Sequence, residues 1–194
     1  MKIYNFEQKS EEWFKVRELK MTASHAQAIG NGKAGLETYI TEMMAEHYST
    51  ALKENFSSKD TERGNELEEF AREMYELETD NKVEQVGFIE ESKYVGCSPD
   101  GLVGTDGLTE FKALNDVGHY KLIRDGYKAI DTKYEWQIQM QMLITDRKWC
   151  DLVFYNPNFE KSLIIFRRER DSESIELIKQ GLEKGKQLIK NQLK

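Results

Sequence analysis

The spacing of apolar residues changes at about residue 80, and this change limits the chain to folds that combine helices with a sheet. Before it, apolar side chains recur every three to four residues in the segments 36–53 and 61–77, as in amphipathic helices. After it come short apolar and β-branched runs separated by turn-forming residues, which is typical of strands. We therefore expect an α/β protein with leading helices and a sheet in the middle.

Capping and turn signals add the individual elements. Ser10 is followed by Glu11, Glu12 and an apolar series, which indicates a capped helix. Thr22 is expected to cap a second short helix, 23–29, that Gly30 ends. The other expected helices are 36–53, 61–77, 116–125, 131–145 and 172–193, and the expected strands are 83–90, 94–97, 101–103, 108–114, 149–155 and 162–168. The apolar stripe of the helix 61–77 is expected to hold Leu67, Phe70, Met74 and Leu77.

Neither a linker nor an internal repeat divides the 194 residues, which suffice for one sizeable domain and not for two independent ones. We expect a single domain, 1–194, with N-terminal helices at 10–77, a hairpin and sheet at about 83–170 and a C-terminal helix at 172–193. Two cysteines cannot form a disulfide framework or a four-thiolate metal site. No window approaches the roughly 18 apolar residues that cross a bilayer, so we expect a cytoplasmic protein with reduced thiols and no membrane partner.

The charge of the chain, −7 with a pI near 5.2, taken alone argues against a nucleic-acid partner. Its distribution is uneven, because residues 61–100 carry 12 acidic and 4 basic groups whereas residues 161–194 carry 5 and 9. An acidic cluster is either a solvated helix face or a site for divalent cations. A polyanionic substrate can approach the second kind only when bound metal neutralises it.

One pair of short motifs carries the candidate chemistry. Asp100 ends the run Ser98-Pro99-Asp100, and Glu110-Phe111-Lys112 follows after a short turn. On a hairpin, Asp100 begins one strand and Glu110 lies on its neighbour, while alternation places Glu110 and Lys112 on one face and Phe111 in the core. Two such carboxylates suit Mg²⁺ or Mn²⁺, with the Phe111 carbonyl as a further possible ligand. The lysine can hold an attacking water and offset charge on a phosphoryl group.

A structural interpretation competes with this one. Pro-Asp-Gly is a common turn tripeptide, so Asp100 can simply fill a turn while Glu110 and Lys112 form a solvent-exposed face. Gln137 and Gln141 share one helical face, where they either lie on the surface or orient something polar.

Two further groups of residues favour the functional interpretation. Glu68, on the acidic helix 61–77, is the candidate for a further metal ligand. Arg17 lies close in sequence to the hydroxyls of Thr22 and Ser24, and an arginine beside hydroxyls at a helix N-terminus is a natural phosphate pocket. The alternative for Arg17 is an ordinary exposed charge on a helix.

In this order, the motifs resemble the phage lambda exonuclease family, also called the YqaJ-like viral recombinase nucleases, of the PD-(D/E)xK nuclease superfamily. The resemblance covers about residues 11–170. It rests on Trp13-x-x-x-Arg17, Thr22-Ala23-Ser24, Gly64-x-x-x-Glu68, Cys97-Ser98-Pro99-Asp100-Gly101-Leu102, Leu108-x-Glu110-x-Lys112 and Gln137-x-Gln139. It implies a restriction-endonuclease-like core, with a central mixed sheet flanked by helices.

The resemblance also implies a role for each catalytic residue. Asp100, Glu110 and the Phe111 carbonyl would bind catalytic metal, and Glu68 would contact a second ion, so that two Mg²⁺ ions are expected and Mn²⁺ should substitute. Lys112 and Gln137 would position the nucleophilic water.

A second group would bind the DNA end. Arg17, Ser24 and Ser98 would hold its 5′-phosphate. The family has another basic residue in this pocket shortly after the lysine, where this chain reads Val117-Gly118-His119. Either His119 substitutes weakly or the contact is missing.

The activity implied is metal-dependent 5′→3′ exonuclease digestion of double-stranded DNA ends. It would release 5′-mononucleotides and leave a 3′ single-stranded tail for phage-type recombination in a bacterial or phage-infected host cell. The family also implies a single-strand annealing protein as partner and a possible homotrimer around DNA. The alternatives are an endonuclease of the same fold and a non-catalytic DNA-end-binding relative, against which the intact set Asp100, Glu110 and Lys112 argues.

Overall fold

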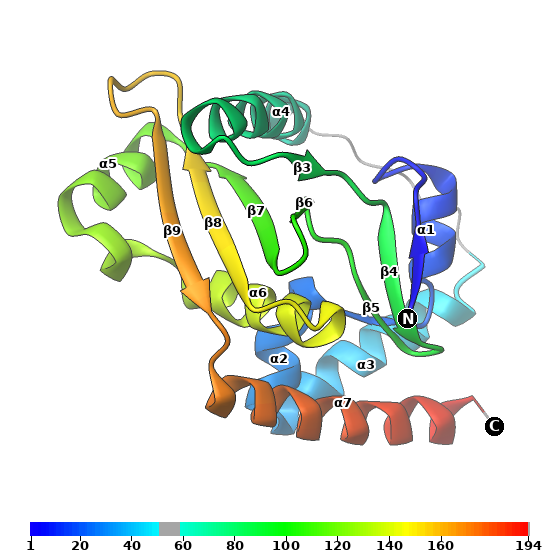
Figure 1. The fold of residues 1–194 in the computed structure, drawn as a ribbon. Helices are drawn as coiled ribbons and strands as arrows, with labels where there is room; N and C mark the ends of the chain where they lie inside the picture. The colour runs from blue at the N-terminus through cyan, green and yellow to red at the C-terminus, as the bar shows by residue number, and fades with distance from the viewer. Residues whose placement is uncertain (51–58, 194) are drawn as a thin grey trace.

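The structure is a computed structural model that describes residues 1–50 and 59–193, without the side chains of 33 and 59–66 (Figure 1). Its helices are α1 (Glu11–Arg17), η1 (Ala23–His25), α2 (Ala26–Asn31), α3 (Lys33–Tyr48), α4 (Lys59–Thr79), α5 (Asp116–Asp125), η2 (Gly126–Ala129), α6 (Thr132–Thr145) and α7 (Ser172–Gln192). Its strands are β1 (Lys2–Tyr4), β2 (Met21–Thr22), β3 (Val83–Glu84), β4 (Phe88–Ser92), β5 (Val95–Cys97), β6 (Gly101–Val103), β7 (Gly107–Ala113), β8 (Trp149–Tyr155) and β9 (Leu163–Glu169).

Two mixed sheets form the middle of the molecule. The larger has the order β3-β6-β7-β8-β9, with β7 and β8 parallel and its other pairs antiparallel. The smaller has the order β1-β4-β5-β2, with β2 parallel to β5. Helix α4 packs on one side of the larger sheet and α6 on the other, and α2, α3 and α7 form a further layer beyond α6 (Figure 1). The predicted mixed sheet flanked by helices is confirmed.

The division into two sheets differs from the sequence prediction. The expected strand 83–90 splits at Val86 and Gly87, so that β3 joins the larger sheet and β4 the smaller. Strands β1 and β2, of three and two residues, were not predicted. Elements this short carry no recognisable alternation, and the hydrogen bonds of their partners define them.

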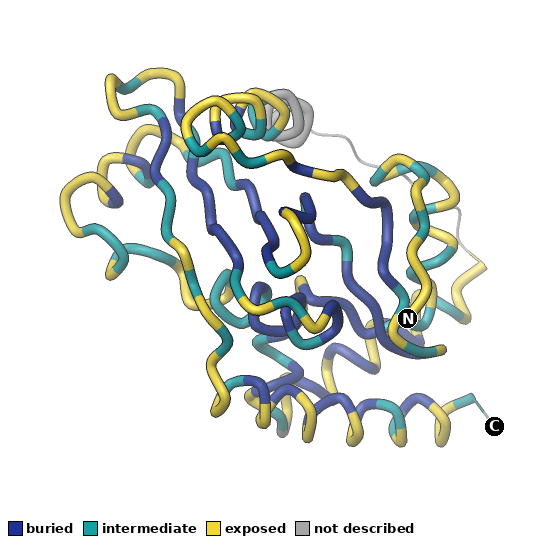
Figure 2. The backbone as a smooth tube through the Cα atoms, in the orientation of Figure 1, coloured by how far each residue is buried: buried dark blue, intermediate teal, exposed yellow. Residues whose placement is uncertain are grey.

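Buried side chains form two clusters, one on each side of the larger sheet. Figure 2 shows that the backbone of its central strands is made largely of buried residues. The larger cluster joins the sheets to α6, α2, α3 and α7. The smaller lies under α4 and contains Ala71, Tyr75, Val103, Phe111 and Val153. The central strands are consequently buried along most of their length, and a charged side chain on them needs a partner.

Helix α4 buries a different face from the one predicted. Phe70 is 55% exposed and Leu77 is 77% exposed, and Met74 is exposed as well. Ala71 and Tyr75 face the sheet instead, and the Tyr75 hydroxyl donates a 2.7 Å hydrogen bond to buried Asp151. The predicted apolar stripe is wrong because Ala71 and Tyr75 form the buried face. A small residue and a tyrosine with a polar hydroxyl contribute little to a hydrophobic pattern read from the sequence.

Several helix ends also differ from the predictions. Gly30 lies inside α2 and not at its end, and the C-cap is Gly32 at φ 62°. Glycine is needed at position 30 for a different reason, since a Cβ there would lie 2.3 Å from the Trp136 ring. Thr22 precedes η1, but its hydroxyl pairs with that of Ser24 and caps no backbone group. Helix α3 ends at Tyr48, and residues 51–53 of the expected helix lie outside the described residues.

The cysteines and the helices bear on the thiol state and on membrane spanning. Cys97 and Cys150 are both free and buried. Among the helices described, none combines the length and apolar character that a membrane crossing requires.

Candidate active site

The hairpin β6–β7 brings Asp100 beside Glu110. Gly101 pairs with Thr109 in the antiparallel register. Asp100, the residue before Gly101, therefore adjoins Glu110, the residue after Thr109. The backbone N–H of Phe111 donates a 2.7 Å hydrogen bond to Asp100 Oδ2, which ties the carboxylate to β7. The Phe111 side chain is buried under α4 and Lys112 lies on the opposite face with Glu110, as the alternation predicted.

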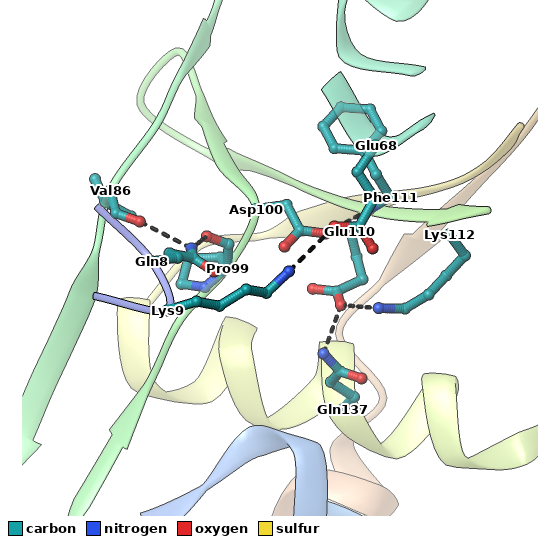
Figure 3. Close-up of polar contacts among 10 residues, drawn as sticks. All are labelled: Gln8, Lys9, Glu68, Val86, Pro99, Asp100, Glu110, Phe111, Lys112 and Gln137. Carbon is teal, nitrogen blue, oxygen red and sulfur yellow. Dashed lines mark hydrogen bonds and ion pairs between the residues drawn. The ribbon is translucent and has the colours of Figure 1, made fainter. Parts of the chain in front are cut away.

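Three donors hold the carboxylate of Glu110, which is 1% exposed. Its Oε1 accepts from Lys112 Nζ at 2.6 Å and from Gln137 Nε2 at 2.5 Å (Figure 3), and its Oε2 accepts from Gln141 Nε2 at 2.7 Å. The two glutamines come from successive turns of α6. The interpretation of Glu110 and Lys112 as a solvent-exposed face is therefore wrong, and the glutamines orient a buried carboxylate.

Glu68 joins this group from α4. Lys9 Nζ lies 3.9 Å from Glu68 Oε2, so that Lys9 and Lys112 approach the carboxylates from opposite sides (Figure 3). Glu68, Asp100 and Phe111 line one cleft of about 680 Å³. Glu68 of α4 and Asp100, which precedes β6, thus face one cleft, and Glu110 of β7 lies beside Asp100.

Burial and mutual repulsion shift the pKa values of these groups. Burial raises the pKa of Asp100 well above its usual range, and Glu110 and Glu68 raise it further against the opposing effect of Lys112. Burial also raises the pKa of Glu68, which Lys112 and Lys9 partly offset. For Lys112 burial alone would lower the pKa, but Glu110 and Asp100 outweigh it and the pKa rises. The site therefore carries an excess of negative charge and a firmly protonated lysine.

The donor set fits a hard divalent ion. No three carboxylate, imidazole or thiolate side chains gather closely enough to enclose a metal in the ranges that the structure describes. Mg²⁺, however, is usually held by one or two carboxylates and keeps several waters. A carboxylate offers about four acceptor positions, and Glu110 uses three of them. Asp100, which accepts a single hydrogen bond from Phe111, keeps more of its capacity.

A second polar group lies just before Asp100 in the sequence. Ser98 Oγ accepts a 2.9 Å hydrogen bond from Trp13 Nε1 and lies 3.4 Å from Arg17 Nη1. The Arg17 guanidinium stacks 3.9 Å from the Trp13 ring, and burial lowers its pKa. The structure thus brings two of the predicted phosphate-binding residues, Arg17 and Ser98, together at the end of α1.

The other two predicted phosphate ligands lie differently. Ser24 is exposed, and its Oγ lies 3.2 Å from Thr22 Oγ1 and from His25 Nδ1, so that its hydrogen bonds in the described structure are to these two residues and not to Arg17. His119 is fully buried on α5, with Nε2 2.8 Å from the Lys161 carbonyl. The expectation that His119 replaces the missing basic residue is therefore corrected, because a side chain enclosed in the protein cannot reach a DNA end.

Sequence reasoning missed three residues of the site. The motif around Trp13 indicates no role for this side chain, yet its indole N–H donates to Ser98 and orients it. Gln8 Nε2 donates to the carbonyls of Val86 at 2.9 Å and Pro99 at 3.0 Å. No periodicity marks the segment 5–9, so Gln8 and Lys9 could be found only through the contacts of the folded chain.

Comparison with known proteins agrees with this geometry. The model of the YqaJ-like viral recombinase domain matches residues 12–148. An alkaline exonuclease, LHK-Exo, from Laribacter hongkongensis is 33% identical with a TM-score of 0.79, covering 94% of this chain and 95% of that one. Its complex with dAMP is 31% identical with a TM-score of 0.74, covering 94% and 97%.

A phage-related exonuclease from Haemophilus somnus 129PT shares the fold alone, with 16% identity and a TM-score of 0.71 over 91% of this chain and 96% of that one. Curated protein sequences give no significant match. The fold, the matched family model and the LHK-Exo relatives agree, and the chain belongs to the YqaJ-like viral recombinase family, as a nuclease of the phage exonuclease kind.

Proposed function

We propose that this protein is a metal-dependent 5′→3′ exonuclease that digests double-stranded DNA from its ends. It releases 5′-mononucleotides and leaves a 3′ single-stranded tail for phage-type recombination. The observation that carries the proposal is the buried Glu110 carboxylate, held by Lys112, Gln137 and Gln141 next to Asp100. Burying a carboxylate this deeply is costly unless it is paired, and a surface turn needs no such arrangement.

Asp100, Glu110, the Phe111 carbonyl and Glu68 would hold two Mg²⁺ ions, for which Mn²⁺ should substitute. When bound, such ions lower the pKa of water and stabilise charge on the phosphoryl group and the leaving oxygen. The residues of the chain hold the water in place. Lys112 and Gln137 both donate to Glu110 Oε1, so the two side-chain nitrogens lie beside the same oxygen.

Lys112 Nζ donates to Glu110, and the charges of Glu110 and Asp100 raise the pKa of the lysine. We assign it no role as the general base. It acts as a charged donor that orients the nucleophile and offsets charge developing on the phosphoryl oxygens.

The 5′-phosphate is proposed to bind at Arg17 and Ser98, with Ser24 completing the pocket. A guanidinium grips phosphate oxygens through two parallel hydrogen bonds, and Trp13 orients both Arg17 and Ser98. Ser98 and Asp100 are two residues apart, a span of about 6.6 Å in extended chain, which joins the end-binding pocket to the metal site at a fixed short separation. The relative LHK-Exo has a structure in complex with dAMP, a 5′-mononucleotide like the proposed product.

The test compares three forms of one DNA molecule: a linear duplex with 5′-phosphates, the same duplex with its ends closed by hairpin loops, and a covalently closed circle. Release of 5′-mononucleotides from the open duplex alone, with Mg²⁺ and not with EDTA, supports the proposal. Cutting of the closed forms would identify an endonuclease. Binding of ends without release in Mg²⁺ or Mn²⁺ would identify an end-binding relative that has lost the chemistry.

A further inference from the structure

A cleft of about 680 Å³ opens at Asp100, separate from the one that Arg17 lines. The segment 5–9 forms one wall and α4, with Glu68 and Arg72, forms another. Because Asp100 lines it, a DNA strand whose 5′-phosphate occupies the Arg17 pocket and whose scissile phosphate lies at Asp100 would continue into this cleft. The reasoning therefore rests on the proposed function.

The segment 5–9 is fixed in place by two hydrogen bonds of its own and by one to the residue that precedes it. Gln8 bridges the carbonyls of Val86 and Pro99, and Gly87 N–H donates a 2.9 Å hydrogen bond to the Tyr4 carbonyl. A Cβ on Gly87 would lie 2.2 Å from the Phe6 carbonyl oxygen, so glycine is required for this close approach. The segment 5–9 is therefore held against the body of the protein as an ordered wall of the cleft.

This wall presents the side chain of Lys9 to the cleft. Lys9 has φ 70°, a left-handed conformation that is uncommon for residues other than glycine and often occurs at functional sites. Its ammonium lies 3.9 Å from Glu68, and its side chain is 47% exposed. An exposed ion pair at this distance contributes little to stability, so exchanging Glu68 for a phosphate oxygen would cost the protein little.

Arg72 lies one helical turn after Glu68 and on the same face of α4. Its Nε is buried without a hydrogen-bond partner among the described residues. Its Nη2 lies 3.5 Å from the exposed carboxylate of Glu69. Arg72 lines the cleft, and the terminal nitrogens of a guanidinium suit phosphate oxygens.

The charge of the lining selects what can bind there. Glu7, Glu68, Glu69 and Asp100 outnumber Lys9 and Arg72, so the cleft by itself repels a free anion. Two divalent ions at the active site would reverse this balance. A DNA strand that spans the metal site is bound only when these ions are present, and its next phosphates would then reach Lys9 and Arg72.

We propose that this cleft binds the backbone of the cleaved strand on the 3′ side of the scissile phosphate, with Lys9 and Arg72 each contacting a phosphate. These contacts are independent of the group at the 5′ end. They would hold the remaining duplex while one nucleotide leaves, and they read no base sequence.

The test measures the affinity of full-length protein for a fluorescent duplex end by anisotropy at several salt concentrations, with Ca²⁺ in place of Mg²⁺ and intact DNA verified afterwards. Lys9→Gly removes the ammonium while glycine accepts the left-handed backbone, and Arg72→Gln removes the guanidinium. Each is expected to weaken binding several-fold at fixed salt and to lower the slope of log affinity against log salt by about 1. The loss should be equal for 5′-phosphate and 5′-hydroxyl ends.

Matched controls separate these contacts from general charge. Lys82→Gln removes an 88% exposed ammonium between α4 and β3, and Arg124→Gln removes an exposed guanidinium on α5; both should bind like wild type. Lys9→Arg should retain affinity, and Arg72→Lys should restore part of it. Thermal unfolding of each variant verifies its fold.

Three outcomes would overturn the inference. Wild-type affinity and salt slope in both Lys9→Gly and Arg72→Gln would show that the cleft holds no phosphate, and equal losses in Lys9→Gly and Lys9→Arg would show that Lys9 acts through the backbone. A loss confined to 5′-phosphorylated ends would place the contacts in the Arg17 pocket. A wild-type protein that neither binds ends nor releases nucleotides would instead refute the proposed function.

Discussion

At the scale of single residues, the folded protein without metal disfavours the charged form of Asp100. Its pKa is raised in the folded state, chiefly by burial and then by Glu110 and Glu68. The folded protein therefore binds this proton more tightly than the unfolded chain does. The stability contributed by Asp100 is present at low pH and is lost as the pH rises through the folded-state pKa.

This linkage gives a prediction for Asp100→Asn, which keeps an oxygen acceptor for the Phe111 N–H. Nucleotide release should fall below detection, because a metal ligand is lost. Without metal, the variant should melt at or above the wild-type temperature at neutral pH, and the difference should shrink as the pH falls below the Asp100 pKa. Calorimetry from pH 8 to pH 5 measures this. A large loss of apo stability would instead make Asp100 a structural turn residue.

Lys112→Ala separates chemistry from binding. Both carboxylates remain, so Mg²⁺ and DNA ends should still bind, while turnover should fall at least about 10²-fold, as for loss of one electrostatic donor. Single-turnover rates and anisotropy measure the two effects. The control is Lys133→Ala, an exposed lysine that lies near the same Tyr134 ring. Near-normal turnover of Lys112→Ala would refute its catalytic assignment.

Arg17→Ala tests the recognition of the 5′ end. The wild type should prefer a 5′-phosphorylated duplex over the hydroxyl-ended one, and the variant should lose most of this preference by slowing only the phosphorylated substrate. Arg17→Lys should restore part of it, since an ammonium keeps the charge without the planar fork. Rates are compared at fixed salt. Equal slowing of both substrates would assign Arg17 to the fold or to general DNA contact.

At the scale of elements, α6 shows which features of the site local sequence patterns can predict. The spacing of Gln137 and Gln141 predicted that they share a helix face, and the hairpin motif predicted that Glu110 and Lys112 share a strand face. Both predictions are confirmed because each depends on local geometry. That Gln141 holds the second oxygen of Glu110 depends on how α6 packs against β7, and a local pattern carries no such information.

The same limit explains the failures on α4 and at the N-terminus. Periodicity identified the helix, but packing against β7 and β8 selected Ala71 and Tyr75 for the buried face, in place of Phe70 and Leu77. Tyr75 is held there by Asp151, a partner 76 positions away along the chain. Contacts over such sequence distances define β1 and the position of Gln8 as well.

Helix α6 leads to a prediction for Gln141→Met, which keeps the volume and removes the donor to Glu110 Oε2. Loss of a residue that orients a metal ligand typically costs about 10–100-fold in metal affinity or activity. The Mg²⁺ concentration for half-maximal activity should rise accordingly. Gln139→Met is the matched control on the same helix, because Gln139 bonds the backbone of Glu169 and Asp171. It should lower stability and leave the Mg²⁺ requirement unchanged, and an equal shift in both variants would contradict the positioning role.

At the scale of the whole molecule, the net charge of −7 limits how the protein can stay on DNA. Long-range attraction to a polyanion needs a positive field, whereas this chain has a net negative charge and its proposed DNA contacts are single cations at Lys9, Arg17 and Arg72. Affinity of this kind is strongly salt-dependent and short-lived. Repeated cleavage without release would therefore require that the protein enclose the duplex, and the ring-shaped homotrimer that the resemblance implies would provide this.

The last prediction joins assembly to processivity. Light scattering should give three times the chain mass of 22.7 kDa, with and without DNA. A trimer should continue to digest a long duplex after excess unlabelled DNA ends are added, because a threaded strand cannot leave by simple dissociation, and its product lengths should change little between low and moderate salt. A monomer should stop when the competitor is added and should lose activity steeply with salt. A monomer that digests through the challenge would contradict the argument, since cations on one open face would then suffice to retain the duplex.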